Sequence, residues 1–438
     1  MDGKEAAQAL FEAGKSILET KWKVESGKIK IEKSSAFRAA RLLEKLQVHL
    51  DEWYKFYKGY DPLFSWWVPE PYEKTQKSIE ELVIIIKEKL VGIGKDDKDA
   101  IVGDPIGREG LLADLDSEMI PYTPEELIEI GEKEYTWCEA EMKKASKELG
   151  YGEKWRDALE YVKTLYVPPG KQTELVRDLS QEVIDHVTKY DLVTVPPIAA
   201  ECWRMYMITP EAQRANPFFL GGTFMQVAYP TNTMDHEWKM MSMRGNNIHF
   251  SRSTVFHELI PGHHLQYHYM ARHRPYRRLF WTPFSIEGWA LYWEMLLWDD
   301  EKFPKTTENR IGMLFWRMHR CARIIFSVKF HLREMTPQEC IDFLVEKVGH
   351  ERSTAEGEVR RSFSGGYSPL YQAGYMLGAL QLYALRREIV SEGKMTEKQY
   401  HDRVLKAGPM QIEFLRALIK NEKVSRDFET RWRFYEER

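Results

Sequence analysis

The sequence predicts a mainly α-helical protein with a small β element near the middle of the chain. The clearest observation is a set of three capping boxes, in which a threonine starts a helix and a Glu or Gln three residues later caps it in return. They lie at 123–126, 336–339 and 396–399. A second observation is that apolar residues recur at three- and four-residue spacings, as on the buried face of a helix. Strand-like stretches are short and few by comparison.

The expected helices follow in chain order. Two are expected between residue 4 and about residue 60, and a third from about 72 to 90. A polar loop that contains glycine is expected at 92–107. The capping boxes predict one helix that ends near residue 149, a second that ends near residue 349, and a third close to the end of the chain.

Three segments are candidates for β-strands. The best is 222–230, which is bounded by glycine and proline. The segments 192–195 and 247–251 are weaker candidates. The β element is therefore expected shortly before residue 256, where the most informative motif of the chain begins.

The composition is that of an ordinary globular protein. The 438 residues suffice for a large core, and we expect a single helical domain, 1–438, with two lobes of about 1–220 and about 221–438. Basic and acidic residues number 63 and 67, which gives a net charge of −4. This balance offers no electrostatic reason to expect a nucleic acid partner.

The cysteines and the start of the chain bear on location. The four cysteines are scattered and include no CxxC pair, so a disulfide framework is not expected. The first residues lack the apolar core of a signal peptide, and no stretch approaches the roughly 20 apolar residues that span a bilayer. We therefore expect a cytoplasmic protein without a membrane partner.

Residues 256–266, Phe-His-Glu-Leu-Ile-Pro-Gly-His-His-Leu-Gln, contain an HExxH motif that is extended by Pro261 and Gly262. In the plain motif two histidines four residues apart bind one Zn²⁺, and the glutamate is the general base. Here His257 and His263 are six apart, which is a rotation of about 240° on an unbroken helix. Proline removes a helical N–H, and glycine accepts unusual backbone angles. We therefore expect a wide turn that aims both histidines at one metal ion.

A third metal ligand is expected from Glu287, within Ser-Ile-Glu-Gly-Trp-Ala-Leu-Tyr. A carboxylate from the next helix completes a His₂Glu site and leaves one position for water. This donor set suits Zn²⁺, although Fe²⁺ uses a similar triad in oxygenases. His264 and His268 form a rival pair at i and i+4. We prefer the first pair because the rival leaves the motif glutamate without a role, but His264 in place of His263 is an open alternative.

The two motifs together resemble a known family, the domain of unknown function 885, whose members carry H-E-x-x-P-G-H-H and E-G-W-A-L-Y. The resemblance extends at least from about Gly103 to Leu380 and includes 107–112 and 368–378. The family in turn looks like the gluzincin metallopeptidases. That likeness implies a helical gluzincin-like architecture with a deep cleft, along which a strand at 223–229 would lie. An ordinary edge hairpin is the alternative for that strand.

The residues predict metal-assisted hydrolysis. Zn²⁺ held by His257, His263 and Glu287 would lower the pKa of a water molecule from about 16 to about 7. Glu258 would accept the water proton as the water attacks a carbonyl carbon, and would then deliver this proton to the leaving nitrogen.

A donor that stabilises the oxyanion is expected in the segment 365–378. Tyr367, Tyr371 and Tyr375 are spaced four apart and would share one helix face. The helical gluzincins use a tyrosine or histidine from a downstream helix, and this resemblance favours Tyr371 or Tyr375. A buried aromatic stripe is the plainer interpretation of the same spacing.

Two groups of arginines are candidates for holding a substrate carboxylate. One is the pair Arg360 and Arg361, which could bind it in a bidentate manner. The other is the basic run at 272–278 between the two metal motifs. Surface ion pairs and a solvated loop are the plainer interpretations.

The expected function is that of a zinc metallopeptidase that cleaves a peptide or a related amide bond. One alternative keeps the zinc but changes the reaction to that of a lyase or a small-molecule amidohydrolase in a biosynthetic pathway. A second alternative is a metal-stabilised binding protein without turnover. The expected partner is therefore a peptide or a small amide.

Overall fold

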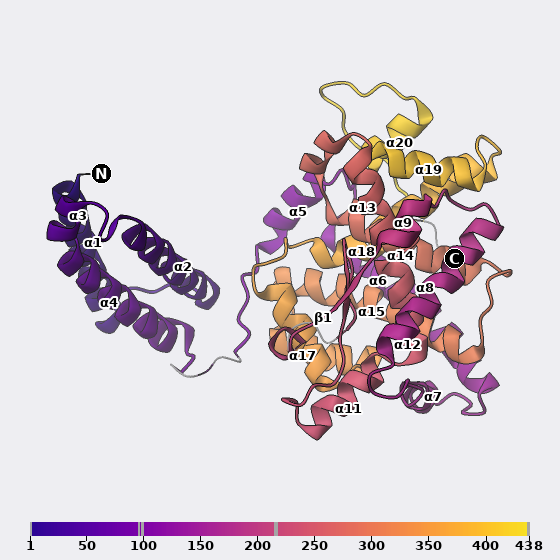
Figure 1. Cartoon of the computed structure of the whole chain (residues 1–438), viewed down its shortest axis with the longest axis horizontal. Helices are drawn as coiled ribbons and strands as arrows, with labels where there is room; N and C mark the ends of the chain where they lie inside the picture. The colour runs from indigo at the N-terminus through magenta and orange to yellow at the C-terminus, as the bar shows by residue number, and fades with distance from the viewer. Residues whose placement is uncertain (1, 95–96, 98–99, 214–217, 436–438) are drawn as a thin grey trace. The chain divides into compact units, whose positions relative to one another are not determined.

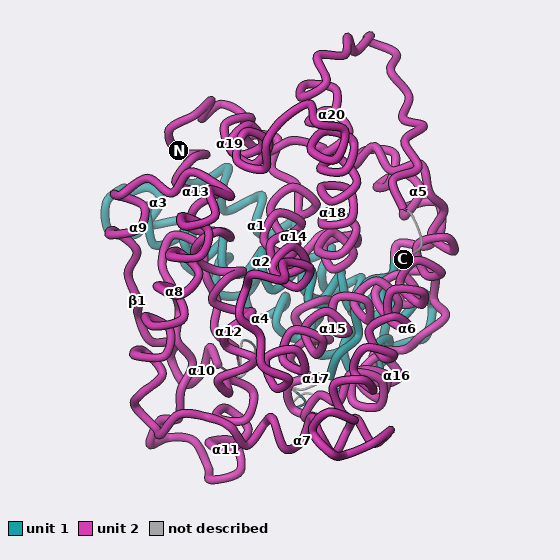
Figure 2. The backbone as a smooth tube through the Cα atoms, turned by 90° about the vertical axis from the view of Figure 1, so that its right-hand side faces the viewer, with its two compact units in different colours: residues 1–105, 363–365 teal, residues 106–362, 366–438 magenta. Residues whose placement is uncertain are grey.

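The computed structural model describes residues 2–94, 97, 100–213 and 218–435, and these form mainly helices, as the sequence predicts. The chain divides into two compact units (Figure 2). The smaller contains Met1–Pro105 with Phe363–Gly365, and the larger contains Ile106–Ser362 with Gly366–Arg438. This boundary lies near residue 105, whereas the sequence led us to expect two lobes that meet near residue 220. The predicted loop at 92–107 contains this boundary, and its residues 95–96 and 98–99 lie outside the described part of the chain.

The smaller unit is built from four helices and one π-helical turn (Figure 1). Their bounds are α1 Gly3–Glu25, α2 Lys33–Tyr57, α3 Pro62–Trp67, α4 Pro69–Ile86 and η1 Lys87–Val91. Apolar residues from α1, α2 and α4 contribute to its core, including Val24, Ala36, Ala40, Ile79 and Leu82. The predicted helices before residue 60 and after residue 72 are confirmed, while α3 was not predicted.

The larger unit carries the rest of the helices. Their bounds are α5 Gly107–Ser117, α6 Pro124–Glu148, α7 Trp155–Lys163, α8 Gln172–Lys189, α9 Pro197–Cys202, α10 Pro210–Gln213, α11 His236–Gly245, α12 Ile248–Glu258, α13 His263–Arg272, η2 Pro275–Phe280, α14 Pro283–Asp299, α15 Thr307–His331, α16 Pro337–Phe343, η3 Leu344–Val348, α17 Arg352–Phe363, α18 Tyr371–Arg386, η4 Arg387–Ser391, α19 Glu397–Ala407 and α20 Ile412–Lys420. All three capping boxes start helices, with threonines at 123, 336 and 396.

Helices α12, α14, α15 and α18 lie together in the larger unit (Figure 1) and pack against one another. The crossing of α14 and α18 is unusually close because glycines line it. A Cβ atom added at Gly288 would lie 2.6 Å from the carbonyl carbon of Gly378, and one added at Gly378 would lie 2.1 Å from the oxygen of Phe284. The two backbones are therefore in direct contact at this crossing.

The β-structure within the described residues is one short parallel pair, β1 Met205–Met207 and β2 Met225–Val227. β2 lies within the predicted strand 222–230. The prediction of strands at 192–195 and 247–251 is wrong. Residues 192–195 have no regular secondary structure. Asn247 instead caps helix α12, because its side chain accepts hydrogen bonds from two backbone N–H groups of the first turn.

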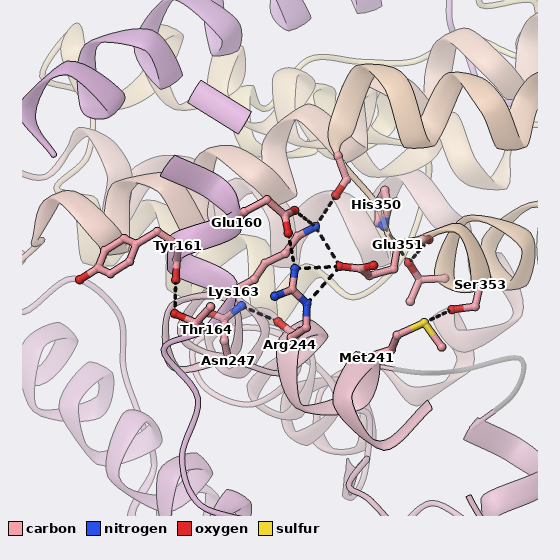
Figure 3. Close-up of polar contacts among 12 residues, drawn as sticks. Glu160, Tyr161, Lys163, Thr164, Met241, Arg244, Asn247, His350, Glu351 and Ser353 are labelled. Atoms are coloured by element: carbon pink, nitrogen blue, oxygen red, sulfur yellow. Dashed lines mark hydrogen bonds and ion pairs between the residues drawn. The ribbon is translucent and has the colours of Figure 1, made fainter. Parts of the chain in front are cut away.

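A charge cluster around the buried Lys163 ties α7, α11 and the start of α17 together (Figure 3). We call Glu160, Lys163, Arg244 and Glu351 the Lys163 cluster. The Lys163 ammonium donates to Glu160 at 2.7 Å, to the oxygen of Gly349 at 2.7 Å and to Glu351 at 3.2 Å. Arg244 donates to the same two glutamates. Every N–H of the buried ammonium therefore has an acceptor.

Candidate metal centre

The interrupted motif forms the turn that the sequence predicts. Helix α12 ends at Glu258, and α13 begins at His263. Glycine is required at position 262, since an added Cβ would lie 1.9 Å from the backbone oxygen of His257. The turn is held from outside by Trp289, whose indole N–H donates to the oxygen of Pro261 at 2.9 Å.

The turn brings His257 and His263 onto the carboxylate of Glu287 from α14. The distances from Glu287 Oε2 are 3.3 Å to His257 Nε2 and 3.1 Å to His263 Nε2. Two ligands of a tetrahedral Zn²⁺, each about 2.0–2.1 Å from the ion, lie about 3.3–3.4 Å apart. All three residues are at most 6 % exposed. The three predicted ligands thus converge with a spacing that fits this metal.

The hydrogen on His257 also fits a metal ligand. Its Nδ1 lies 2.8 Å from Glu294 Oε1, and a carboxylate can only accept there, so Nδ1 carries the hydrogen. Nε2, which faces Glu287, is then the nitrogen that would bind a metal ion. A neutral imidazole that is held by a carboxylate on its far side is a common arrangement around zinc. Glu294 was not predicted from the sequence, although it follows Glu287 by seven residues, or two helical turns, on the same face of α14.

The two central glutamates have opposite electrostatic environments. Burial alone would raise the pKa of Glu287, but the charge of His263 and hydrogen bonds from both histidines bring it well below the ordinary value. Burial raises the pKa of Glu258 above its ordinary value, and the nearby histidines offset this only in part. Glu287 therefore stays ionised, as a ligand must, while Glu258 is better suited to accept a proton.

Glu258 lies close to the two histidines and to the β element. One of its carboxylate oxygens and the ligand nitrogens of His257 and His263 all lie within 4.8 Å of one another. A Cβ atom added at Gly221 would lie 2.4 Å from both Cβ and Oε2 of Glu258. The segment that leads into β2 therefore runs directly beside the carboxylate.

Two of the three predicted tyrosines belong to the site through α18. Tyr371 donates a hydrogen bond to Glu287 Oε1. The ring of Tyr375 stacks on that of His257, with centroids 5.9 Å apart and planes 17° apart. Tyr367 does not share their helix face, because α18 starts only at Tyr371. The loop before α18 contains Gly365 with a positive φ, and it ends the predicted periodicity.

Tyr267 is a further residue of the centre that was not predicted from the sequence. Its ring stacks on that of His263, with centroids 5.7 Å apart and planes 9° apart. Tyr267 follows His263 by four residues on α13, which is the spacing of neighbours on one helix face. Its aromatic ring and that of Tyr375 therefore each cover one histidine of the centre.

The other predicted candidates make their hydrogen bonds outside the triad of His257, His263 and Glu287. His264 places its Nε2 3.0 Å from the oxygen of Ala199, so His263 is the histidine of this pair that faces Glu287. In the basic run, Arg277 donates to the oxygen of Ala407 at 2.6 Å. Arg361 donates to the hydroxyl of Tyr367 at 3.1 Å.

Comparison with known proteins gives one family and a likeness of fold to solved structures. Residues 73–419 match the model of a family described as bacterial protein of unknown function (DUF885). No curated protein sequence matches the chain. A similar structure is that of a provisionally described lipoprotein of unknown function from Shewanella oneidensis, with 20 % identity, a TM-score of 0.71, and coverage of 89 % of this chain and 73 % of that one. Another provisionally described lipoprotein, from Colwellia psychrerythraea, has 17 % identity, a TM-score of 0.65, and coverage of 95 % and 74 %.

These two likenesses concern the fold, and the word lipoprotein describes those proteins. Within the residues that the structure describes, none of the helices combines the length and the apolar composition needed to cross a membrane. The cytoplasmic location expected from the sequence is not tested by either observation and stays a prediction.

Proposed function

Since the chain belongs to the DUF885 family of bacterial proteins of unknown function, we propose from its own residues that it is a zinc-dependent hydrolase that cleaves a peptide or a related amide bond. The observation that carries this proposal is the convergence of two imidazole nitrogens on one carboxylate oxygen at 3.3 and 3.1 Å. A second carboxylate, that of Glu258, has an oxygen within 4.8 Å of both histidine nitrogens, and we assign it to proton transfer.

The proposed zinc ligands are His257, His263 and Glu287, with Glu294 orienting His257 from behind. When bound, the ion polarises a carbonyl group and lowers the pKa of a water molecule to about 7. Tyr371 keeps Glu287 in place through its hydrogen bond. The burial of all three ligands keeps bulk water away from the reacting groups, which strengthens their electrostatic interactions.

Glu258 is the proposed general base. Its raised pKa places it closer to the range in which a carboxylate can both take a proton from water and return it to a leaving nitrogen. Of the two predicted oxyanion donors, Tyr375 is the better candidate. The hydroxyl of Tyr371 is already donated to Glu287, whereas Tyr375 stacks on His257 and has no hydrogen-bond partner among the described residues.

The experiment combines metal content with turnover. We expect elemental analysis to find one zinc per wild-type chain and much less in Glu287→Ala. A panel of peptides and N-acylated amino acids then identifies the bond that is cleaved, and Glu258→Gln should lower kcat/KM roughly 100- to 10,000-fold. Zinc retained by both proteins would rule out the third ligand. Cleavage of acylated amino acids alone would favour the small-molecule amidohydrolase, and bound zinc without any turnover would favour a binding protein.

A further inference from the structure

Helix α15 carries three buried arginines at three-residue spacing, and one of them lacks a close carboxylate partner. Arg317 and Arg323 each donate to a glutamate oxygen at 2.7 Å. Arg320 is 7 % exposed, and the glutamate oxygen with which it pairs, Glu294 Oε1, is 4.0 Å from its Nη2. Its Nε has no hydrogen-bond partner among the described residues.

Such a guanidinium calls for an explanation. It has exchanged water for protein without receiving acceptors in return, which is unfavourable for a charged donor. Folded proteins retain few buried polar groups in this state. The Glu294 oxygen is already the acceptor for His257 Nδ1 at 2.8 Å, so it serves Arg320 only in part. Burial and the charge of Arg323 also lower the pKa of Arg320, as expected where positive charge is in surplus.

The unpaired donors lie next to the candidate metal centre. The ring of Tyr375 contacts His257, and the guanidinium carbons of Arg320 and Arg323 lie 4.7 and 4.3 Å from the centroid of the same ring. Arg323 also has one nitrogen, Nη1, without a partner among the described residues. Two guanidinium groups with spare N–H donors are thus one aromatic ring away from a metal ligand. We call Glu294, Arg320, Arg323 and Tyr375 the Arg320 cluster.

The charges of this region are consistent with a negative ligand. With a divalent cation at the centre, the buried groups carry at least one positive charge in excess, a statement that rests on the proposed function. The carboxylates are Glu258, Glu287, Glu294 and Glu358, and the guanidinium groups are those of Arg320, Arg323 and Arg361.

We propose that Arg320, with Arg323 beside it, binds a free carboxylate of the substrate. The substrate would then be a short peptide that is cleaved close to its C-terminus, or an amino acid acylated on nitrogen. Guanidinium groups bind carboxylates through two parallel N–H donors, and Arg320 and Arg323 have such donors to spare. An extended residue spans only about 3.5 Å, so the carboxylate would follow the cleaved bond by few residues.

The test compares N-acetylated tripeptides that have a free C-terminal carboxylate with the same tripeptides as C-terminal amides. Zinc-loaded wild-type protein should cleave the acids roughly tenfold to a hundredfold more efficiently in kcat/KM. In Arg320→Gln the ratio of acid to amide should fall towards one, and Arg320→Lys should give an intermediate ratio. Arg317→Gln is the matched control, because Arg317 lies on the same helix and pairs with Glu134, so the ratio should persist.

A second readout does not depend on turnover. Calorimetry with zinc-loaded Glu258→Gln protein should show tighter binding of the acid than of the amide, and this difference should disappear when Arg320→Gln is added. If wild-type protein cleaves no tripeptide, the proposed peptidase function fails. The calorimetric difference still shows whether Arg320 binds a free carboxylate. Equal binding of acid and amide overturns it, and so does an acid preference that survives both Arg320 substitutions. An equal loss for acid and amide in Arg320→Gln would show that Arg320 acts only by holding Glu294.

Discussion

The Lys163 cluster and the Arg320 cluster both bury cationic side chains between helices of the larger unit, but they differ in how their N–H groups are satisfied. In the first, Lys163 has three acceptors within 3.2 Å. In the second, Arg320 has one glutamate oxygen at 4.0 Å, and its Nε has no partner in the part of the chain that the structure describes. The first cluster contains two cations and two carboxylates. The second lies among four carboxylates and three guanidinium groups, and a bound divalent cation would bring their total to at least one positive charge in excess.

This difference separates a structural role from a binding role. Charges that serve only the fold gain most when their partners are already in the protein, because each desolvated group then regains its hydrogen bonds. Charges that serve a ligand are left partly unsatisfied, and the ligand supplies the missing partner. We therefore expect substitutions in the Lys163 cluster to change stability, and substitutions in the Arg320 cluster to change binding.

The largest effect on stability is expected for Lys163→Met. The change leaves Glu351 and a backbone carbonyl without their buried donor, and it should cost about 3 kcal/mol of unfolding free energy. Denaturant unfolding measures this loss, and zinc content per folded chain should be unchanged. A loss below about 1 kcal/mol would contradict the structural role. Lys171→Met, in an exposed pair with Glu174, is the control and should change stability little.

The next effect is expected for Glu294→Gln. An amide in place of this carboxylate supports the imidazole of His257 less strongly, which typically weakens zinc binding roughly tenfold to a hundredfold. Competition with a chelator measures the zinc affinity. Glu301→Gln is the control, since Glu301 is exposed beyond the end of α14. Unaltered affinity in Glu294→Gln would show that the contact between Glu294 and His257 does not support the metal.

A smaller effect is expected on the pH dependence of stability. It concerns His350, whose pKa is shifted by charges from both clusters. Burial lowers its pKa to about 3, and the charges of Lys163, Arg323 and Arg320 act in the same direction, while that of Glu358 opposes them. The unfolded chain binds a proton near pH 6.5, whereas the folded chain does not until near pH 3. Stability should therefore fall as pH drops below about 6.5, by up to about 1.4 kcal/mol per pH unit from this residue. Unfolding measured from pH 7 to pH 4.5 should show a correspondingly shallower slope in His350→Gln, and an unchanged slope would contradict the assignment.

The smallest effect on stability is expected for Arg320→Met in zinc-loaded protein. The substitution removes contacts with two aromatic rings but also removes a poorly solvated charge, so the two contributions oppose each other. We expect the unfolding free energy to change by about 1 kcal/mol or less. A loss as large as that of Lys163→Met would show that Arg320 serves the fold, and the two clusters would then be of one kind.

The sequence was informative where local chemistry decides the structure. Thr123, Thr336 and Thr396 each start a helix, because a capping box depends only on residues within one turn. The Pro-Gly turn and its convergence with Glu287 were also predictable, since the HExxH spacing leaves few other geometries. At Asn247 the same local rule was overlooked, and a helix start was mistaken for a strand.

The remainder depends on contacts between segments that are distant in sequence. Nothing near Arg320 indicates that Arg317 and Arg323 have close carboxylate partners and that Arg320 does not, although the three are evenly spaced on one apolar helix. The unit boundary near residue 105 likewise depends on which helices pack together. The roles of Tyr371 and Tyr375 could be separated only once the crossing of α14 and α18 was known.

That crossing has a practical consequence for recognising other chains that can build the same centre. Because Gly288 and Gly378 place no side chain between the helices, the distance from Glu287 to Tyr371 is set by how closely the two backbones pack. A bulkier residue at either glycine would push the two helices apart and so separate the Glu287 carboxylate from Tyr371. A search that demands a glycine directly after the glutamate, and another seven positions after the tyrosine, should therefore distinguish chains that can form this centre from those that merely contain two histidines and a glutamate in the right order.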